Sequence, residues 1–326
     1  MYAMLLVASL SFCVSLAGLL VLLSAPVRRL ALDHPNSRSL HVTPVPRTGG
    51  LAILTGATVS LAFVSGQDWS LMLIALALAA VSFGDDLFGL PAAWRLAAHL
   101  AAAAFALWLI HPRPEALLII PLLLGIGWIT NLYNFMDGSD GLAGGMAIAG
   151  FGTFAIAAQM HGSNSLAVLC IAIASASFAF LLFNFQPAKI FMGDAGSIPL
   201  GFLAGAIGVA GWQESVWPLW FPVLVFSPFI VDATLTLAKR VFRREKVWEA
   251  HREHYYQRAI QMGLSHRGTA LAEYALMAAC SAAALSARTA SPGIQASVLV
   301  AATLTYAAIC LNIDSRWSRH VRETPH

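Results

Sequence analysis

The chain of 326 residues has little charge. Only 11% of its residues are Asp, Glu, Lys or Arg, whereas 58% are hydrophobic. A soluble domain carries about 25% charged residues, so this composition excludes a chain made of soluble domains. Most of the sequence must face lipid or other apolar helices.

Cysteine is scarce as well. The four cysteines lie far apart, each in an apolar run, at Cys13, Cys170, Cys280 and Cys310. No Cys-x-x-Cys spacing occurs, which argues against a zinc site or a disulfide framework. We interpret all four as small buried thiols.

The sequence contains many long apolar stretches. The first lacks a basic n-region and a small-residue cleavage site, so it is interpreted as a retained helix rather than a signal peptide. Eleven stretches are long enough for helical spans. They cover residues 2–24, 49–66, 69–84, 95–111, 116–136, 142–160, 165–183, 197–212, 216–238, 269–287 and 293–311. We predict an all-α, polytopic transmembrane helix bundle of about eleven spans, forming one integral-membrane domain over residues 1–326.

The basic residues predict an orientation. With eleven spans and the N-terminus outside, only Arg113 and Arg288 fall outside, and 17 of the 19 basic residues fall inside. The positive-inside rule then makes the N-terminus periplasmic and the C-terminus cytoplasmic. Both long polar segments, residues 25–48 and 239–268, lie on the cytoplasmic side, where we expect the chemistry.

Acidic residues gather at the predicted cytoplasmic edge of the membrane. Asp85 and Asp86 follow the third stretch, Asp137 and Asp140 follow the fifth, and Asp194 lies in FMGDAGS. Acids at this depth cost free energy, so their gathering on one side indicates a function. Individually, an Asp-Asp pair also fits a solvated helix end, and DGxDG also fits a Ca²⁺-like turn.

A divalent cation with a phosphate-bearing substrate explains such a cluster. Mg²⁺ takes one or two carboxylates and completes its shell with phosphate oxygens and water. Asp137 and Asp140 would share a face if their segment were helical. A GDAGS turn that opens a helix at Ser197 would aim backbone N–H groups at an anion.

Two further segments carry candidate phosphate contacts. His251, His254 and Arg258 are spaced to share one helical face, where they would meet an anionic substrate. In the first loop, Arg38, His41 and Arg47 are candidates for the same role. The alternatives are a basic segment that touches anionic lipid headgroups and a solvated positive loop.

The ninth stretch has two features of its own. Pro222 and Pro228 are expected to kink it and to open a lipid-facing groove. Asp232 lies within it, and on its own this residue also fits a transporter acid or the partner of a buried base.

With these motifs the chain resembles the polyprenyl-phosphate N-acetylhexosamine-1-phosphate transferases, glycosyltransferase family 4. The matching stretches are PVPRTGG, FGDDLFG, NLYNFMDGSDGLAGG, NFQPAKIFMGDAGS and the histidine segment, in family order over about residues 33–268. The resemblance implies transfer of a sugar-1-phosphate from a UDP-N-acetylhexosamine to undecaprenyl phosphate, with UMP released. It also implies Mg²⁺, which Mn²⁺ can replace, and a homodimer is a further expectation. A nucleic-acid partner is not expected.

The resemblance implies roles for individual residues. Asp85 and Asp86 would stand near the polyprenyl phosphate, with Asp85 as candidate base, and Asp194 would bind Mg²⁺. The nucleotide and substrate pocket would use Asn134, Asp137, Asp140, Asn184, Phe191 and Arg47. The diphosphate or sugar would contact His251, His254 and Arg258.

The chain also departs from part of the family. The transferases that use MurNAc-pentapeptide carry a lysine soon after the acidic pair and a run of adjacent histidines. Here Leu87-Phe88-Gly89 and HREHYYQR stand instead. The chain therefore looks more like the subgroup in the bacterial inner membrane that starts O-antigen or capsule-type glycans. The rival is a transporter or flippase of lipid-linked sugars, which would place its acids near the midplane in repeat-related helices.

Overall fold

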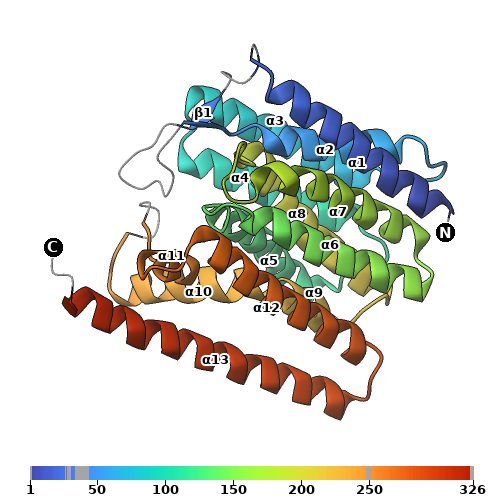
Figure 1. The fold of residues 1–326 in the computed structure, drawn as a ribbon. Helices are drawn as coiled ribbons and strands as arrows, with labels where there is room; N and C mark the ends of the chain where they lie inside the picture. Colours follow the sequence, from blue (N-terminus) through green and yellow to red (C-terminus); the bar gives the residue numbers. More distant parts are fainter. Residues whose placement is uncertain (1, 26, 28–30, 34–43, 247–250, 324–326) are drawn as a thin grey trace.

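The computed structural model describes residues 2–25, 27, 31–33, 44–246 and 251–323, except for the side chains of residues 86–88. The described residues form thirteen helices and one two-stranded sheet (Figure 1). The helices are α1 (Tyr2–Leu22), α2 (Gly49–Leu61), α3 (Ser70–Phe88), α4 (Ala92–Leu109), α5 (Ala116–Phe135), α6 (Leu142–His161), α7 (Asn164–Asn184), α8 (Asp194–Gln213), α9 (Trp220–Val225), α10 (Ser227–Phe242), α11 (Tyr255–Gln261), α12 (His266–Ala287) and α13 (Pro292–Glu323). Strands β1 (Leu32–Asp33) and β2 (Val45–Pro46) pair antiparallel.

Every predicted apolar stretch contains a helix, and the protein is a polytopic helical membrane protein. In the described part of the chain, eight helices are long and apolar enough to cross a membrane: α1, α4, α5, α6, α7, α8, α12 and α13. Helix α2 and the described part of α3 are apolar but shorter. The sheet was not predicted, because it lies in a polar loop without a periodic apolar pattern. For the segment that contains α11, the spacing of His251, His254 and Arg258 predicted a shared helical face.

The ninth stretch is broken, as its prolines predicted. Helix α9 ends at Val225 and α10 begins at Ser227, with Pro228 in its first turn. Proline has no backbone N–H to donate to the preceding turn, which favours a new helix start at this point.

Helix α8 lies at the centre of the bundle and α13 at its edge. In their apolar windows, 89% of the α8 residues are buried but only 6% of the α13 residues. Helix α8 packs against α3 and α5. Helix α13 runs along the outside of the molecule (Figure 1). The central helix is therefore held by protein on most sides, whereas α13 faces lipid.

Small residues allow close packing on the other side of the bundle. Ser11 and Ser15 of α1 donate hydrogen bonds to the carbonyls of Ala172 (2.7 Å) and Ala176 (3.1 Å) on α7. Such contacts are typical of helices in a membrane, where close van der Waals packing replaces hydrophobic burial. Cys13 is exposed, which corrects the expectation that all four thiols are buried, since it lies on the outer face of α1.

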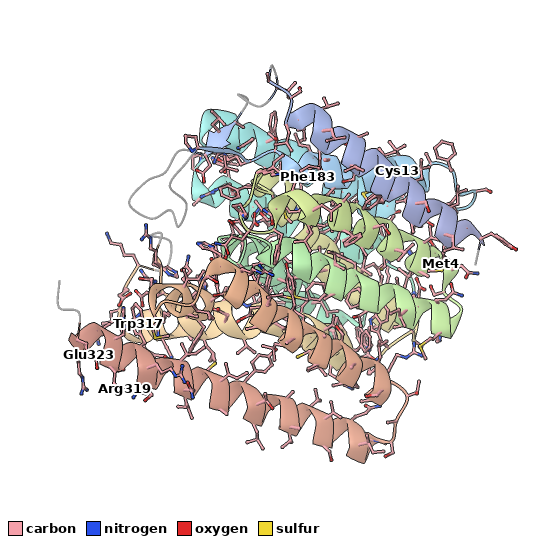
Figure 2. All side chains as sticks on the ribbon, in the orientation of Figure 1. Met4, Cys13, Phe183, Trp317, Arg319 and Glu323 are labelled. Carbon is pink, nitrogen blue, oxygen red and sulfur yellow. The ribbon has the colours of Figure 1, made fainter. Side chains whose placement is uncertain are left out.

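One end of the bundle carries the sheet, α11 and the C-terminal end of α13 (Figure 1). We call it the loop end. Met4 lies at the opposite end from Trp317, Arg319 and Glu323 (Figure 2). The described parts of both long polar segments are therefore at the loop end.

Candidate active site

The first and fourth sequence motifs dock on each other at the loop end. The backbone N–H of Phe191 donates to the Pro46 carbonyl (2.8 Å), and those of Gly49 and Gly50 donate to the carbonyls of Phe191 and Met192 (both 2.9 Å). A side chain at Gly50 would collide with the backbone of Gly196. PVPRTGG and FMGDAGS thus form one backbone-paired unit, which explains the glycines in both.

Asp194 begins α8 and is held by an amide from α5. Asn134 Nδ2 donates to Asp194 Oδ1 (2.8 Å) and to Ser197 Oγ (2.9 Å). The helix begins three residues before the predicted start at Ser197, because Gly193 ends the preceding loop with φ 72° and ψ 166°. Asp194, the predicted Mg²⁺ ligand, and Asn134, a predicted residue of the nucleotide pocket, are therefore in direct contact.

Asp137 points to the same helix start. Its carboxylate accepts a hydrogen bond from the Gly193 backbone. Burial raises the pKa of Asp137 well above its usual range, and the nearby negative charge of Asp194 raises it further. Asp137 and Asp194, from different segments, thus lie close enough for the charge of Asp194 to act on Asp137.

Asp140 turns away from Asp137. The segment between α5 and α6 is a turn rather than a helix, so the prediction that the two acids share a helical face is wrong. Asp140 accepts a hydrogen bond from the Ala188 backbone (3.0 Å). Asn184 accepts from the Gly141 N–H and donates to the Ile190 carbonyl, both at 2.9 Å. These two side chains join the segment DGSDG (residues 137–141), which we call the DGSDG turn, to the loop that precedes α8.

The acidic pair lies at the end of α3. Asp85 accepts hydrogen bonds from the Leu90 backbone (2.5 Å) and from Arg95 Nη1 on α4 (3.3 Å). The backbone of Asp86 lies in the same helical turn, but its side chain is outside the described part of the structure, as are Arg38 and His41. Asp85 is therefore already paired with a cation.

His99 is a polar residue that the sequence analysis missed. It is buried one helical turn after Arg95, and its Nδ1 lies 3.2 Å from Asn131 Oδ1 on α5. The charges of both Arg95 and Asp194 act on it. His99 thus lies between the α3–α4 corner and the start of α8. A lone histidine within the alanine-rich run AHLAAAAF was the one available signal.

The histidine segment is fixed by Asp232. This buried carboxylate accepts hydrogen bonds from the backbone of Tyr255 and Tyr256 (both 2.9 Å), and one of its oxygens lies 3.1 Å from His254 Nδ1. A carboxylate at a helix N-terminus is stabilising because free N–H groups point toward it. Of the roles left open for Asp232, the structure supports the partner of a basic group.

His254 lies beside the DGSDG turn. Its ring is 6.4 Å from the ring of Phe135, and the Tyr256 hydroxyl donates to the Phe135 carbonyl (3.4 Å). The His251 ring is 4.9 Å from the His254 ring. The helical face predicted for His251, His254 and Arg258 does not form, because α11 begins only at Tyr255.

Arg258 and Arg47 were both predicted to contact the substrate, and the structure gives them different neighbours. Arg258 is buried and pairs with Asp314 on α13 (3.0 Å). The Arg47 carbonyl lies so close to Gly193 that a side chain there would collide with it. The structure therefore brings Asn134, Asp137, Asp194 and the Arg47 backbone together at the start of α8, and it pairs Arg258 with Asp314 on the C-terminal helix.

An apolar cavity opens between α5, α8 and the break between α9 and α10. Its volume is about 280 Å³, and its lining includes Gly125, Gly205, Gly208, Pro222 and Phe226. The predicted kink therefore has a groove beside it that is wide enough for hydrocarbon.

The chain resembles known proteins over most of its length. A profile described as glycosyl transferase family 4 matches residues 68–211. A probable undecaprenyl-phosphate N-acetylglucosaminyl 1-phosphate transferase of Bacillus subtilis is 30% identical in an alignment of 289 positions that covers 81% of this chain and 80% of the relative. Decaprenyl-phosphate N-acetylglucosaminephosphotransferases are 30% identical in Mycobacterium tuberculosis (77% of this chain, 75% of the relative) and in Mycobacterium leprae (75% and 73%).

The structure defines a polytopic helical membrane protein with several carboxylates at one end, and the relatives specify its class. The chain belongs to the polyprenyl-phosphate N-acetylhexosamine-1-phosphate transferase family, and it is a sugar-phosphate transferase. The family predicted from the sequence is confirmed, and the rival transporter is not favoured, since each of these relatives is named as a transferase.

Proposed function

We propose that the protein transfers N-acetylglucosamine-1-phosphate from UDP-N-acetylglucosamine to undecaprenyl phosphate, as the first step of O-antigen or another cell-envelope glycan. The names of the relatives support this sugar and a polyprenyl-phosphate acceptor. The observation that carries the proposal is the meeting of Asp137 and Asp194 at the Asn134-held start of α8.

The reaction exchanges one phosphoanhydride for another. An oxygen of the lipid phosphate attacks the β-phosphorus of the UDP-sugar and forms a new P–O–P bond. The bond between the β-phosphorus and the bridging oxygen breaks, and UMP leaves with that oxygen and its electron pair. Because a phosphate monoester with a second pKa of about 6 is largely ionised near neutral pH, a base adds little. This suits an Asp85 that is already paired with Arg95.

The donor set fits a magnesium ion. Asp137 and Asp194 supply two carboxylates of the kind that Mg²⁺ takes. The pKa of Asp137 is raised mainly by burial and further by the charge of Asp194, and a cation bound there would offset that charge. When bound, Mg²⁺ offsets the charge of the two phosphate-bearing substrates. Asn134 orients Asp194, and the Asp232 contact fixes the His254 ring, which we assign to a phosphate or the sugar.

The remaining site residues frame the donor. Asn184 and Asp140 brace the loop that carries Phe191, which we assign to the uracil side of the pocket. His251 and Arg47 are assigned to the phosphates or headgroup. The acceptor tail would lie in the apolar cavity beside Pro222, with its phosphate at the loop end.

The location follows from the charge distribution. We propose eleven spans in the bacterial inner membrane, with the loop end in the cytoplasm. An odd number of spans requires the chain ends to lie on opposite sides, and Met4 and Glu323 lie at opposite ends of the bundle (Figure 2). UDP-sugars are cytoplasmic metabolites, so the site would face its donor.

The decisive experiment incubates the purified protein with undecaprenyl phosphate and a panel of UDP-sugars and follows UMP release. We expect turnover with UDP-N-acetylglucosamine, loss of turnover with EDTA, and recovery on adding Mg²⁺ or Mn²⁺. Full turnover without a divalent ion would refute the metal assignment. Release of no UMP with any UDP-sugar would refute the proposed reaction.

Asp194→Asn tests the carboxylate itself. We expect it to slow UMP release by at least on the order of 100-fold, since a preorganised group at the reacting phosphates is lost. Asp68→Asn is the matched control. The Asp68 carboxylate accepts a hydrogen bond from the Ser70 N–H (2.8 Å), just before the start of α3, whereas Asp85 lies near the end of that helix. Near-normal activity of Asp194→Asn would remove Asp194 from the metal site.

A further inference from the structure

The C-terminal helix makes an ion cluster at the loop end. Asp314 of α13 accepts from Arg258 Nη1 (3.0 Å), from Lys239 Nζ (2.5 Å) and from the Tyr255 hydroxyl (3.3 Å). Arg258 also lies over the ring of Trp317, at 5.7 Å from its centroid. One acid thus ties together α10, α11 and α13.

This attachment contrasts with the rest of α13. Its apolar window is almost wholly exposed to lipid, whereas the Arg258 side chain that it pairs with is only 6% exposed. A buried guanidinium is costly unless an acid stays paired with it. The turn of α13 at the loop end is therefore held against α10 and α11 by the contacts of Asp314, although most of the apolar part of α13 is exposed.

Helix α11 is consequently held from two sides. Asp232 of α10 binds its first backbone N–H groups and His254, while Asp314 binds Tyr255 and Arg258. His254 lies immediately before the first residue of α11. Movement of α11 away from α13 would move the His254 ring relative to the DGSDG turn.

We propose that Asp314 is a positioning residue that clamps α11, and with it the His254 ring, against the active site. The assignment rests on the proposed function for its effect on turnover, but the clamp itself is a property of the fold. It lies outside residues 68–211, to which the family profile aligns. It also gives Arg258 a role as the partner of Asp314 rather than as a substrate ligand.

The test compares Asp314→Asn with Asp314→Glu and with the control Glu323→Gln, which removes the same charge from an exposed position on the same helix. We expect Asp314→Asn to lower kcat by about tenfold to a hundredfold, the size expected when a catalytic group is misplaced by about 1 Å. The KM for undecaprenyl phosphate stays unchanged, Asp314→Glu recovers most of kcat, and Glu323→Gln keeps all of it.

A second readout does not depend on the reaction. Hydrogen exchange of residues 251–261, measured on the full chain in lipid nanodiscs, is expected to quicken in Asp314→Asn but not in Glu323→Gln. Unchanged exchange together with unchanged kcat would overturn the clamp. If the wild-type protein releases no UMP from any UDP-sugar, the proposed function fails while the exchange experiment still decides the clamp.

Arg258 gives a further check. Asp314→Asn combined with Arg258→Gln should lower kcat by less than the product of the two single losses, because both changes remove the Arg258–Asp314 pair, whereas Arg258 also pairs with Glu253 (3.5 Å). Independent, multiplying losses would overturn the pairing. If Asp314→Asn does not accumulate in membranes, Lys239→Gln removes one Asp314 contact and should change exchange and kcat in the same direction but less.

Discussion

At the residue scale, Gly193 determines whether the two central motifs can meet. Its backbone, at φ 72° and ψ 166°, lies in a region that is essentially restricted to glycine. Its α-carbon also faces the Arg47 carbonyl, and its N–H donates to Asp137. One residue without a side chain therefore joins the first loop, the DGSDG turn and α8.

Gly193→Ala is expected to destabilise the fold. The backbone conformation alone costs about 1–3 kcal/mol for a residue with a side chain, and the contact with Arg47 adds to it. Thermal unfolding in nanodiscs should show a lower Tm and weaker UMP binding. Gly152→Ala is the control, because a side chain there meets open space, and its Tm should be unchanged or higher. An unaltered Tm in Gly193→Ala would contradict this account.

His251 gives the site a pH dependence. Burial, together with the charges of His254 and Arg240, lowers its pKa from 6.5 to about 4. Below pH 6.5 the unfolded chain binds a proton that the folded chain does not, so stability is complete above pH 6.5 and falls as the pH drops toward 4. Tm measured across this range should fall less in His251→Gln than in the wild type. An identical fall in both would exclude His251 as its source.

The sequence named candidate site residues but not the partners of their side chains. Asp194 was assigned to Mg²⁺ and Asn134 to the nucleotide pocket, and the hydrogen bond between them was not predicted. Arg258 was assigned to the substrate and pairs with Asp314, a residue that no local pattern distinguished. Arg258 and Asp314 are 56 positions apart, and the spacing of residues along one helix carries no information about a partner so far along the chain.

At the element scale, the break between α9 and α10 shapes the proposed acceptor groove. Leu219, Pro222 and Phe226 line one side of the apolar cavity, and Gly125 of α5 lines the other. Because Gly125 has no side chain and a Cβ there would meet open space, the cavity remains open at this point.

Gly125→Leu should fill part of this cavity. We expect the KM for undecaprenyl phosphate to rise by about tenfold, which corresponds to about 1.4 kcal/mol of lost binding. The affinity for UMP should stay the same. Gly152→Leu makes the same chemical change in α6, away from the cavity, and serves as control. A KM that is unchanged in Gly125→Leu would mean that the acceptor lies elsewhere.

The helices were predictable because each long apolar run can satisfy its backbone in a membrane only as a helix. The prolines of the ninth run also predicted its interruption. The elements in the polar loops could not be predicted in this way. The start of α11 depends on Asp232, which binds its first N–H groups from 23 positions earlier in the chain.

At the scale of the whole molecule, the loop end must lie on one side of the membrane. Exposed Arg244 follows α10 at the loop end, and exposed His161 ends α6 at the other end. In a chain without its native cysteines, Arg244→Cys should react with an impermeant thiol reagent only in inside-out vesicles, and His161→Cys only in intact cells. Labelling of Arg244→Cys from outside would invert the proposed orientation.

The sequence by itself determined that this chain is a helical membrane protein, where most of its helices lie and to which family it belongs. Those features depend on hydrophobic runs and contiguous motifs, which are local. Only the tertiary structure decided that Asp140 turns away from Asp137, that Asp232 anchors α11 and that Asp314 reaches Arg258. These contacts arise because packing brings distant helices together, and polar side chains buried there take whichever partner satisfies them.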